Sequence, residues 1–335
     1  MRGIIIIMRT ESPPSVRAKV IGLAGCRRMK GWRQLAVCLL PLNQPDPSFM
    51  KTFSSSLLPI LAAALLTHSA SHAEIAVKSG EKIAFLGDSI TQGGWSNPAG
   101  YVRLVIAGLE ANGVHAEPVP AGISGHKSDQ MLARLDKDVL SKKPQWMTLS
   151  CGVNDVWHGP RGVPLDEAMA KSGTYDDKVA TRGTYKKNIT AIIDQAVAAG
   201  VKPVMLTATV IHENLNSNEN ALLAPYNNFL RQLAREKGVP MADLYAMFET
   251  RLKAENKPNV KVLTSDGVHM NTEGNKLMAA GVLKAFGLNE AELDKAKASW
   301  SALETAAVEF TKKQAEARAK AAAEKAKGKP APNKK

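Results

Sequence analysis

An apolar run that ends in glycine, KIAFLGDSIT at residues 82–91, has the pattern of a buried strand followed by a sharp turn. Further strand patterns follow along the chain, and longer stretches with helical periodicity separate them. The predicted strands lie at 82–86, 115–120, 145–150, 203–207 and 239–242, and the predicted helices at 101–111, 129–140, 185–199, 224–237 and 272–286. This alternation predicts an α/β fold with a mainly parallel sheet between two layers of helices. Residues 156–184 have no strong period, and we expect a long loop there, near the strand ends.

The composition is that of a globular protein, because 44% of the 335 residues are hydrophobic and 22% are charged. This excludes a chain that is disordered throughout, a collagen-like fibre and a multi-span membrane protein. The net charge of +13 arises at the two ends, since residues 1–73 and 311–335 each hold nine basic and two acidic side chains. Residues 74–310 hold 26 basic and 27 acidic side chains. The central region is therefore nearly neutral, and we expect no nucleic-acid partner.

Residues 50–73 have the features of a secretory signal peptide. A lysine precedes an apolar core at 57–66, and Ser71-His72-Ala73 offers small residues for cleavage before Glu74. The alternative is a buried N-terminal helix. Because a signal peptide normally starts at the initiator methionine, we interpret residues 1–49 as a mis-annotated extension, with a disordered basic leader as the alternative. A cleaved signal peptide predicts a secreted or periplasmic protein.

We predict one catalytic domain at residues 74–288, followed by an Ala/Lys-rich helix and a basic tail at 289–335. Apolar residues recur in this last segment at helical spacing, at Leu293, Trp300, Leu303 and Phe310. Lysine dominates beyond Thr311. Two interpretations stay open for the tail: a solvated helix that frays, or a weak contact with anionic cell wall or lipid headgroups.

The cysteines and histidines do not indicate a disulfide or a metal site. Cys151 is the only cysteine beyond residue 73, so the predicted domain cannot contain an internal disulfide. No Cys/His cluster has the spacing of a zinc site. We therefore expect neither a metal nor another cofactor.

Motifs rich in glycine and polar residues follow the first three predicted strands, and another precedes the last helix. They are Gly87-Asp88-Ser89, Gly122-Ile123-Ser124-Gly125, Gly152-Val153-Asn154-Asp155 and Asp266-Gly267-Val268-His269. In a parallel sheet the carboxyl ends of the strands meet at one edge, where ligands bind. Here a serine can act as a nucleophile, a glycine N–H and an asparagine amide can hold an oxyanion, and a histidine beside an aspartate can act as a general base.

Each motif alone also has a structural explanation. Ser89 could cap a helix, and Asn154 could form an Asx-turn. Gly125 could serve a plain loop, and His269 could make a purely structural hydrogen bond. The joint occurrence of nucleophile, two donors and acid–base pair, in this order, favours catalysis.

In these residues the chain resembles the GDSL/SGNH hydrolase family, which is named for such a serine, glycine, asparagine and histidine in ordered motifs. The match spans about residues 80–286, and Ile90 stands where the family name has leucine. The resemblance implies a flavodoxin-like three-layer α/β/α sandwich and serine esterase chemistry that proceeds through an acyl-enzyme without a metal. The residues that it places in the active site are Ser89, Asp266 and His269 as the triad and Ser89, Gly125 and Asn154 as the oxyanion hole.

A chain whose central region is nearly neutral and whose residues are only 5% aromatic offers no obvious lipid-binding surface. We therefore expect a short acyl ester on a carbohydrate, with acetyl as the favoured acyl group. The candidate substrate-binding residues are Asp88, Asp155, Trp157 and His158; the last two could instead anchor the long loop. A lysophospholipase- or arylesterase-type activity is the alternative. A non-catalytic envelope- or carbohydrate-binding protein is a further one, but loss of Ser89 or His269 would be its signature, and both are present.

Overall fold

The computed structural model describes residues 74–256 and 260–327. The leader expected at 1–49 and the signal peptide expected at 50–73 lie outside the described residues. Among the described helices, none combines the length and the apolar character that a bilayer span requires.

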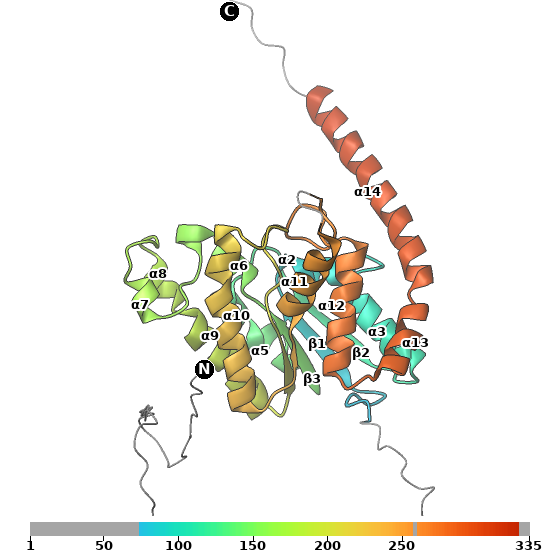
Figure 1. Cartoon of the computed structure of the whole chain (residues 1–335), viewed down its shortest axis with the longest axis horizontal. Coiled ribbons are helices and arrows are strands. Elements are labelled where there is room, and N and C mark those ends of the chain that lie inside the picture. The colour runs from blue at the N-terminus through green and yellow to red at the C-terminus, as the bar shows by residue number, and fades with distance from the viewer. Residues whose placement is uncertain (1–73, 257–259, 328–335) are drawn as a thin grey trace, which may run out of the picture. The chain divides into compact units, whose positions relative to one another are not determined.

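A five-stranded sheet forms the centre of the described chain, and all neighbouring strands pair in parallel (Figure 1). The strands are β1 (Lys82–Gly87), β2 (Glu117–Gly122), β3 (Trp146–Ser150), β4 (Lys202–Leu206) and β5 (Met241–Ala242). Their order, β2-β1-β3-β4-β5, is that of flavodoxin-like sheets. The strand order reverses at β1, which pairs with β2 on one side and with β3 on the other. The predicted parallel α/β sheet is therefore confirmed.

Helices cover both faces of the sheet, which confirms the three-layer arrangement (Figure 1). One layer contains α3 (Tyr101–Ala111), α12 (Thr272–Ala285) and α13 (Glu290–Ala298). The other contains α4 (Ser128–Ala133), α9 (Tyr185–Ala198) and α10 (Asn218–Lys237). The other described helices are α2 (Ser89–Ser96), α5 (Leu135–Asp138), α6 (Val153–Trp157), α7 (Glu167–Ala170), α8 (Val179–Arg182), α11 (Leu244–Glu255) and α14 (Ser301–Lys327), with 3-10 turns at Leu140–Lys142 and Gly159–Arg161.

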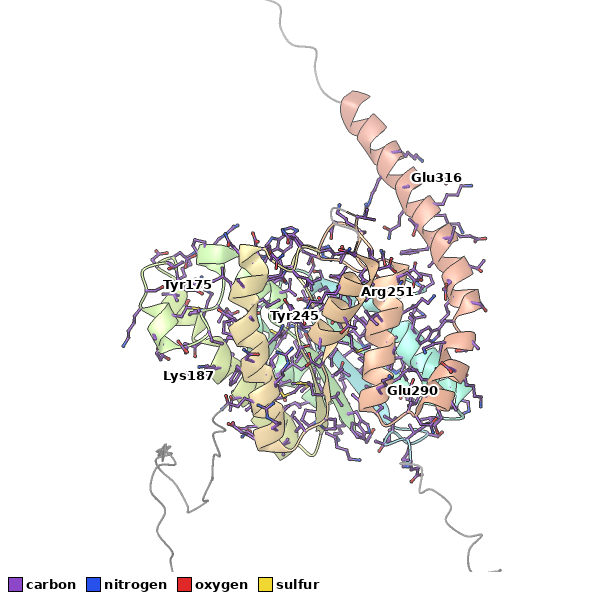
Figure 2. All side chains as sticks on the ribbon, viewed as in Figure 1. Tyr175, Lys187, Tyr245, Arg251, Glu290 and Glu316 are labelled. Carbon is purple, nitrogen blue, oxygen red and sulfur yellow. The ribbon has the colours of Figure 1, made fainter. Side chains whose placement is uncertain are left out.

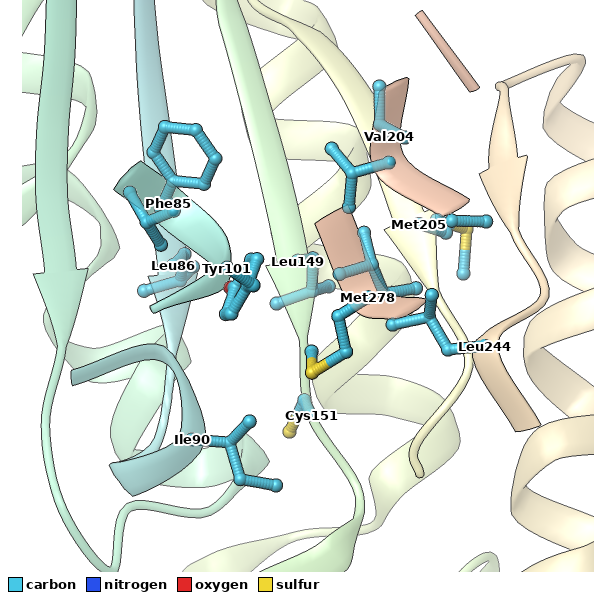
Figure 3. Packing of buried hydrophobic residues seen from close by; sticks show 14 of the residues in the cluster. Phe85, Leu86, Ile90, Tyr101, Leu149, Cys151, Val204, Met205, Leu244 and Met278 are labelled. Carbon is cyan, nitrogen blue, oxygen red and sulfur yellow. The ribbon is translucent and has the colours of Figure 1, made fainter. Parts of the chain in front are cut away.

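The central strands are buried on both faces, which explains why their sequences are nearly continuous apolar runs. The strand side chains that are at most 2% exposed include Phe85, Leu86, Leu149, Val204 and Met205. Tyr101 and Met278, from two helices, belong to the same cluster (Figure 3). The ring of Tyr101 meets that of Phe85 edge to face, with 6.3 Å between the centroids.

Two helices differ in extent from the sequence prediction. The helix expected at 129–140 is interrupted at Arg134, whose side chain turns inward to the ends of β1 and β2. The helix expected at 224–237 begins six residues earlier, at Asn218. Ser217 caps it by accepting a hydrogen bond from the Asn220 N–H at 3.2 Å, and Pro225 is accommodated inside the helix.

Two other segments contain more helix than expected. α11 escapes prediction because only Leu244 and Phe248 of its 12 residues are buried, so its apolar pattern is weak. The loop expected at 156–184 contains the short helices α7 and α8. The last strand, β5, has 2 residues and is shorter than the expected 239–242. The second strand also differs, since β2 runs from Glu117 to Gly122 and not over 115–120, whereas β1 and β3 end within one residue of the predicted positions.

The packed core continues past residue 288, where the sequence pattern placed the end of the domain. Trp300 is 1% exposed, and its indole N–H donates to the carbonyl oxygen of Leu104 on α3 at 2.9 Å. Residues 311–320 of α14 are all exposed, and the side chains around Glu316 extend into solvent (Figure 2). The first part of the C-terminal segment therefore packs on the domain, and a solvated helix follows.

We expect Trp300→Ala to lower the free energy of unfolding by about 3–5 kcal/mol, the usual cost of truncating a buried tryptophan. The matched control is Val308→Ala, because Val308 lies on α14, shortly after Trp300 in the chain, but is 72% exposed. This control should change stability by no more than about 0.5 kcal/mol. Urea unfolding followed by circular dichroism measures both variants. A Trp300→Ala protein as stable as the wild type would contradict the packing of this segment on α3.

Candidate active site

Ser89 is the first residue of α2, directly after the carboxyl end of β1. The helix is capped by Asp88, whose carboxylate accepts a hydrogen bond from the Ile90 N–H at 2.9 Å. The Ser89 hydroxyl is therefore not needed as a helix cap. Its Oγ lies instead 2.9 Å from Nε2 of His269, a residue 180 positions away in the sequence.

His269 reaches the serine from a loop between α11 and α12. Its Nδ1 lies 2.6 Å from Oδ2 of Asp266, and Oδ1 of Asp266 accepts hydrogen bonds from the backbone N–H groups of Val268 and His269 at 3.0 and 2.8 Å. Burial acts to raise the pKa of the Asp266 carboxyl, but the hydrogen bonds from His269 and Val268 outweigh it and lower the pKa from 3.8 to about 2. An ionised aspartate orients the imidazole and leaves Nε2 for the serine.

Gly125 and Asn154 lie beside the turn that carries the serine. Gly125 has a φ of +76°, which glycine adopts without strain, and apart from its chain neighbours no described heavy atom lies within 4 Å of where a Cβ would stand. Asn154 is 4% exposed. Its Nδ2 donates to the carbonyl oxygen of His126 at 3.1 Å and lies 3.4 Å from Oδ2 of Asp88. Asn154 thus joins the loop of Gly125 to the turn of Ser89.

Asp88 and Asp155, which we expected to contact substrate, both have buried carboxylates. Asp88 is 2% exposed and Asp155 is 1% exposed. Asp155 accepts hydrogen bonds from the backbone N–H and the hydroxyl of Ser128 at 3.0 and 2.6 Å. Burial raises the pKa of Asp88 from 3.8 to about 7 and that of Asp155 from 3.8 to about 6. Both side chains support the turns around the site.

Trp157 and His158 stand at the end of α6. Trp157 is 42% exposed, and its ring lies 6.1 Å from that of His212 at an interplanar angle of 90°. The His212 ring in turn covers Gly267, where a Cβ would come within 2.7 Å of its Nδ1. His158 is half-buried, and burial together with nearby positive charges lowers the pKa of its imidazole. Trp157 therefore offers an accessible aromatic surface that His212 connects to the loop of the acid–base pair.

Sequence reasoning missed two residues at this edge of the sheet. Arg134 is 8% exposed and ties the ends of β1 and β2 together, since its guanidinium donates to the carbonyl oxygens of Gly87 and Ala121 at 2.8 and 2.9 Å. Its Nε also lies 3.1 Å from Nδ1 of His126. No local pattern indicates this role. His212, by contrast, follows the carboxyl end of β4, so the rule that directs attention to strand ends could have found it.

Proton transfer and hydrogen bonding are the chemistry that these side chains can perform. His269 is a candidate base in contact with a hydroxyl, and Asp266 holds it on the other side. Within the described residues, no group of three or more His, Cys, Asp or Glu side chains is placed to hold a metal ion. The arrangement matches that of a nucleophile activated by a neighbouring base.

Comparison with known proteins gives a family and two named relatives. The sequence model of the GDSL-like lipase/acylhydrolase family matches residues 85–277. An acetylxylan esterase of Geobacillus stearothermophilus is 28% identical over 225 residues, which cover 63% of this chain and 96% of that protein. An uncharacterised lipoprotein of Bacillus subtilis (strain 168) is 21% identical over 184 residues, which cover 48% of this chain and 70% of that protein.

Solved structures agree in fold. The crystal structure of the acetylxylan esterase from Geobacillus stearothermophilus has a TM-score of 0.52 at 24% identity, and the match covers 64% of this chain and 97% of that chain. The crystal structure of another acetyl xylan esterase has a TM-score of 0.51 at 32% identity and covers 61% of this chain and 98% of that chain. The family match alone spans more than half of the sequence. The chain therefore belongs to the GDSL-like lipase/acylhydrolase family and is a carboxylic ester hydrolase.

Proposed function

We propose that this chain is a secreted serine esterase that removes acetyl groups from carbohydrate through an acyl-enzyme. The hydrogen bonds from Ser89 to His269 and from His269 to Asp266 carry the proposal. The His269 side chain is 40% exposed, so the reacting serine stands at an accessible surface. A purely structural histidine would not need a serine hydroxyl on one nitrogen and an ionised carboxylate on the other.

In the first step, Nε2 of His269 takes the hydroxyl proton while Oγ of Ser89 attacks the carbonyl carbon of the ester. Asp266 stabilises the imidazolium that forms. The N–H groups of Ser89 and Gly125 and the Nδ2 of Asn154 are the donors to the oxyanion, each worth about 3–4 kcal/mol of barrier in comparable enzymes. His269 then protonates the departing sugar oxygen, and the acetyl group stays on Ser89. Water, activated by His269, finally releases acetate.

The named relatives and the exposed side chain of Trp157 support an acetylated carbohydrate as substrate. Two of the relatives, one identified by sequence and one by structure, are named as acetylxylan esterases. Trp157 is 42% exposed and offers an aromatic face of the kind on which the C–H faces of sugars pack. Within residues 74–256 and 260–320, the other large apolar side chains that are exposed stand on separate segments, at Ile123, Val197, Leu222, Val260 and Val308. Such scattered residues do not favour a groove for a long acyl chain.

Asp88, which caps the helix of Ser89, has a protonation state that changes with pH. Burial raises its pKa from 3.8 to about 7, so folding takes up a proton between these two pH values. The stabilisation from this group is fully present below the unfolded pKa of 3.8 and is lost as the pH rises through about 7.

Export is part of the proposal and rests on the N-terminal sequence. Residues 50–73 carry the charge, the apolar core and the small residues of a cleavable signal peptide. A distant relative bears the name of a lipoprotein, which supports a location in the cell envelope or beyond it. A polymeric carbohydrate would be reached there.

We expect the wild-type protein to deacetylate acetylated xylan and to hydrolyse p-nitrophenyl acetate with a kcat/KM at least about tenfold above that on the palmitate. Ser89→Ala should lower kcat by at least about a thousandfold, because the nucleophile is lost, without a change in melting temperature. Acetate release and p-nitrophenol absorbance measure both effects.

The control for this experiment is Ser141→Ala, because the Ser141 hydroxyl donates only to the nearby carbonyl oxygen of Lys137 at 2.8 Å. This variant should keep full activity. Normal turnover by a folded Ser89→Ala protein would rule out the mechanism. Faster hydrolysis of the palmitate or of a lysophospholipid would replace the carbohydrate assignment with a lipolytic one.

Asp88→Asn should flatten the pH dependence of stability. Between pH 4 and pH 8 the wild-type free energy of unfolding should lose up to roughly 4 kcal/mol through Asp88, and the variant should not show this loss. Urea unfolding at several pH values measures it. Asp155, whose pKa is about 6, contributes its own slope in both proteins. Its charge also raises the pKa of Asp88, so the difference between the two curves reports the titration of Asp88 together with its coupling to Asp155. The exposed Asp136→Asn is the control, and parallel curves for Asp88→Asn and wild type would contradict the prediction.

The mature protein purified from its native host should begin near Glu74. Intact-mass analysis measures this directly. A mass that retains residues 50–73, or one that begins at Met1, would contradict the signal peptide and remove the support for an extracellular polymer as substrate.

A further inference from the structure

The loop between β4 and α10 (residues 207–217, the β4–α10 loop) lies against the segment that carries the acid–base pair, and the proposed mechanism does not use it. That segment, residues 264–270, is a hairpin closed by an antiparallel bridge between Thr264 and Met270. We refer to it as the catalytic hairpin. The side chains of its Asp266 and His269 are 53% and 40% exposed, so packing alone does not hold them.

The carboxylate of Glu213 accepts four hydrogen bonds from residues 262–264, where the chain enters the catalytic hairpin. Its Oε2 accepts from the Val262 N–H at 2.6 Å. Its Oε1 accepts from the Leu263 N–H at 3.0 Å, and from both the N–H and the hydroxyl of Thr264 at 2.6 and 2.5 Å. Hydrogen bonds to a charged acceptor are stronger than neutral ones, so this carboxylate is the main polar anchor of the segment.

The Thr264 hydroxyl links the Glu213 carboxylate to the backbone beside the acid–base pair. Its Oγ1 donates to Glu213 and accepts from the Gly267 N–H at 3.1 Å. Gly267 directly follows Asp266 in the chain. Thr264 itself is 1% exposed, so the link is shielded from water.

The β4–α10 loop is itself held firmly enough to serve as a support. Asn220 of α10 is 1% exposed, and its side chain accepts from the Ile211 N–H at 2.9 Å and donates to the carbonyl oxygens of Ile211 and Asn214 at 2.7 and 2.8 Å. His212 has a φ of +54°, which is uncommon for a residue with a side chain, and its ring lies against Gly267. The loop therefore contacts the catalytic hairpin at two places.

We infer that Glu213 is a positioning residue that holds Asp266 and His269 in register with Ser89. Glu213 touches none of the reacting atoms, and acts through Thr264 and the backbone of the hairpin. Displacement of a catalytic group by about 1 Å can cost about a hundredfold in rate, so a small movement of the hairpin suffices for a measurable effect. The inference rests on the proposed triad chemistry.

The first test compares Glu213→Ala with Glu213→Gln. For p-nitrophenyl acetate we expect Glu213→Ala to lower kcat about 10- to 100-fold with KM within about twofold of wild type. Glu213→Gln keeps one acceptor oxygen, so its kcat should fall less than that of Glu213→Ala. The control is Glu219→Ala in the first turn of α10, which should keep wild-type kcat.

A second pair of measurements separates positioning from a general loss of fold. In a His269→Ala background, removal of Glu213 should lower the residual activity by less than about twofold, because the group through which it acts is already absent. The nearly isosteric Thr264→Val removes only the hydroxyl link and should lower kcat several-fold. Should Glu213→Ala not fold, Glu213→Gln and Thr264→Val provide the same test.

Hydrogen–deuterium exchange tests the structural part without an activity assay. Exchange of the amides at 262–269 should rise in Glu213→Ala and stay unchanged in Glu219→Ala. A wild-type protein that hydrolyses no ester would overturn the proposed function. The exchange rates would still show whether Glu213 stabilises the backbone of the catalytic hairpin. A folded Glu213→Ala protein with wild-type kcat, or one that loses as much activity with His269 absent as with it present, would overturn this inference alone.

Discussion

The position of β1, buried on both faces and paired in parallel with a strand on each side, is the constraint on which the rest of the site depends. Parallel pairing brings the carboxyl ends of β1, β2 and β3 to one edge, so the turns that follow them must be neighbours. Gly87 ends β1 where a Cβ would lie 2.0 Å from Oγ1 of Thr91, so this sharp entry into α2 requires glycine. Ser89 and Asn154, which are distant in sequence, are delivered to the same place by this arrangement.

Buried polar side chains then refine what the sheet provides. Asp88 caps the helix of the serine, Asp155 binds the start of α4 through Ser128, and Arg134 ties the carbonyl groups of two strand ends. Burial raises the pKa of both aspartates, which means that the folded protein holds their charges at a cost in stability near neutral pH. Oriented groups of this kind spare an active site the reorganisation that water would need during the reaction. The buried aspartates therefore lower the free energy of unfolding near neutral pH, but they define the geometry around Ser89.

The two halves of the site are built on different supports. The proposed nucleophile and oxyanion donors stand on the segments that directly follow β1, β2 and β3, whereas Asp266 and His269 stand on a hairpin, where their own side chains are 53% and 40% exposed. Local hydrogen bonds orient the imidazole within the hairpin, but they do not determine where the hairpin lies relative to Ser89. The carboxylate of Glu213 supplies a connection from the sheet to that segment. Ser89 and His269 are 180 positions apart in the sequence. The β4–α10 loop, which none of the four motifs includes, connects the segment of His269 to the sheet.

The sequence alone determined the strands, the glycine and polar motifs at their ends, and the Asp266–His269 pair, because each is a local pattern. Strands buried on both faces are continuous apolar runs, and an aspartate three residues before a histidine can reach its Nδ1 through local backbone geometry. The family resemblance supplied the contact between Ser89 and His269 and the sheet order. Only the tertiary structure decided that Asp88 and Asp155 are buried, that Arg134 lies among strand ends and that Glu213 holds the catalytic hairpin. The burial and partners of a charged side chain depend on groups far away in the chain; those of Arg134 include carbonyls 13 and 47 residues distant, and no local pattern encodes them.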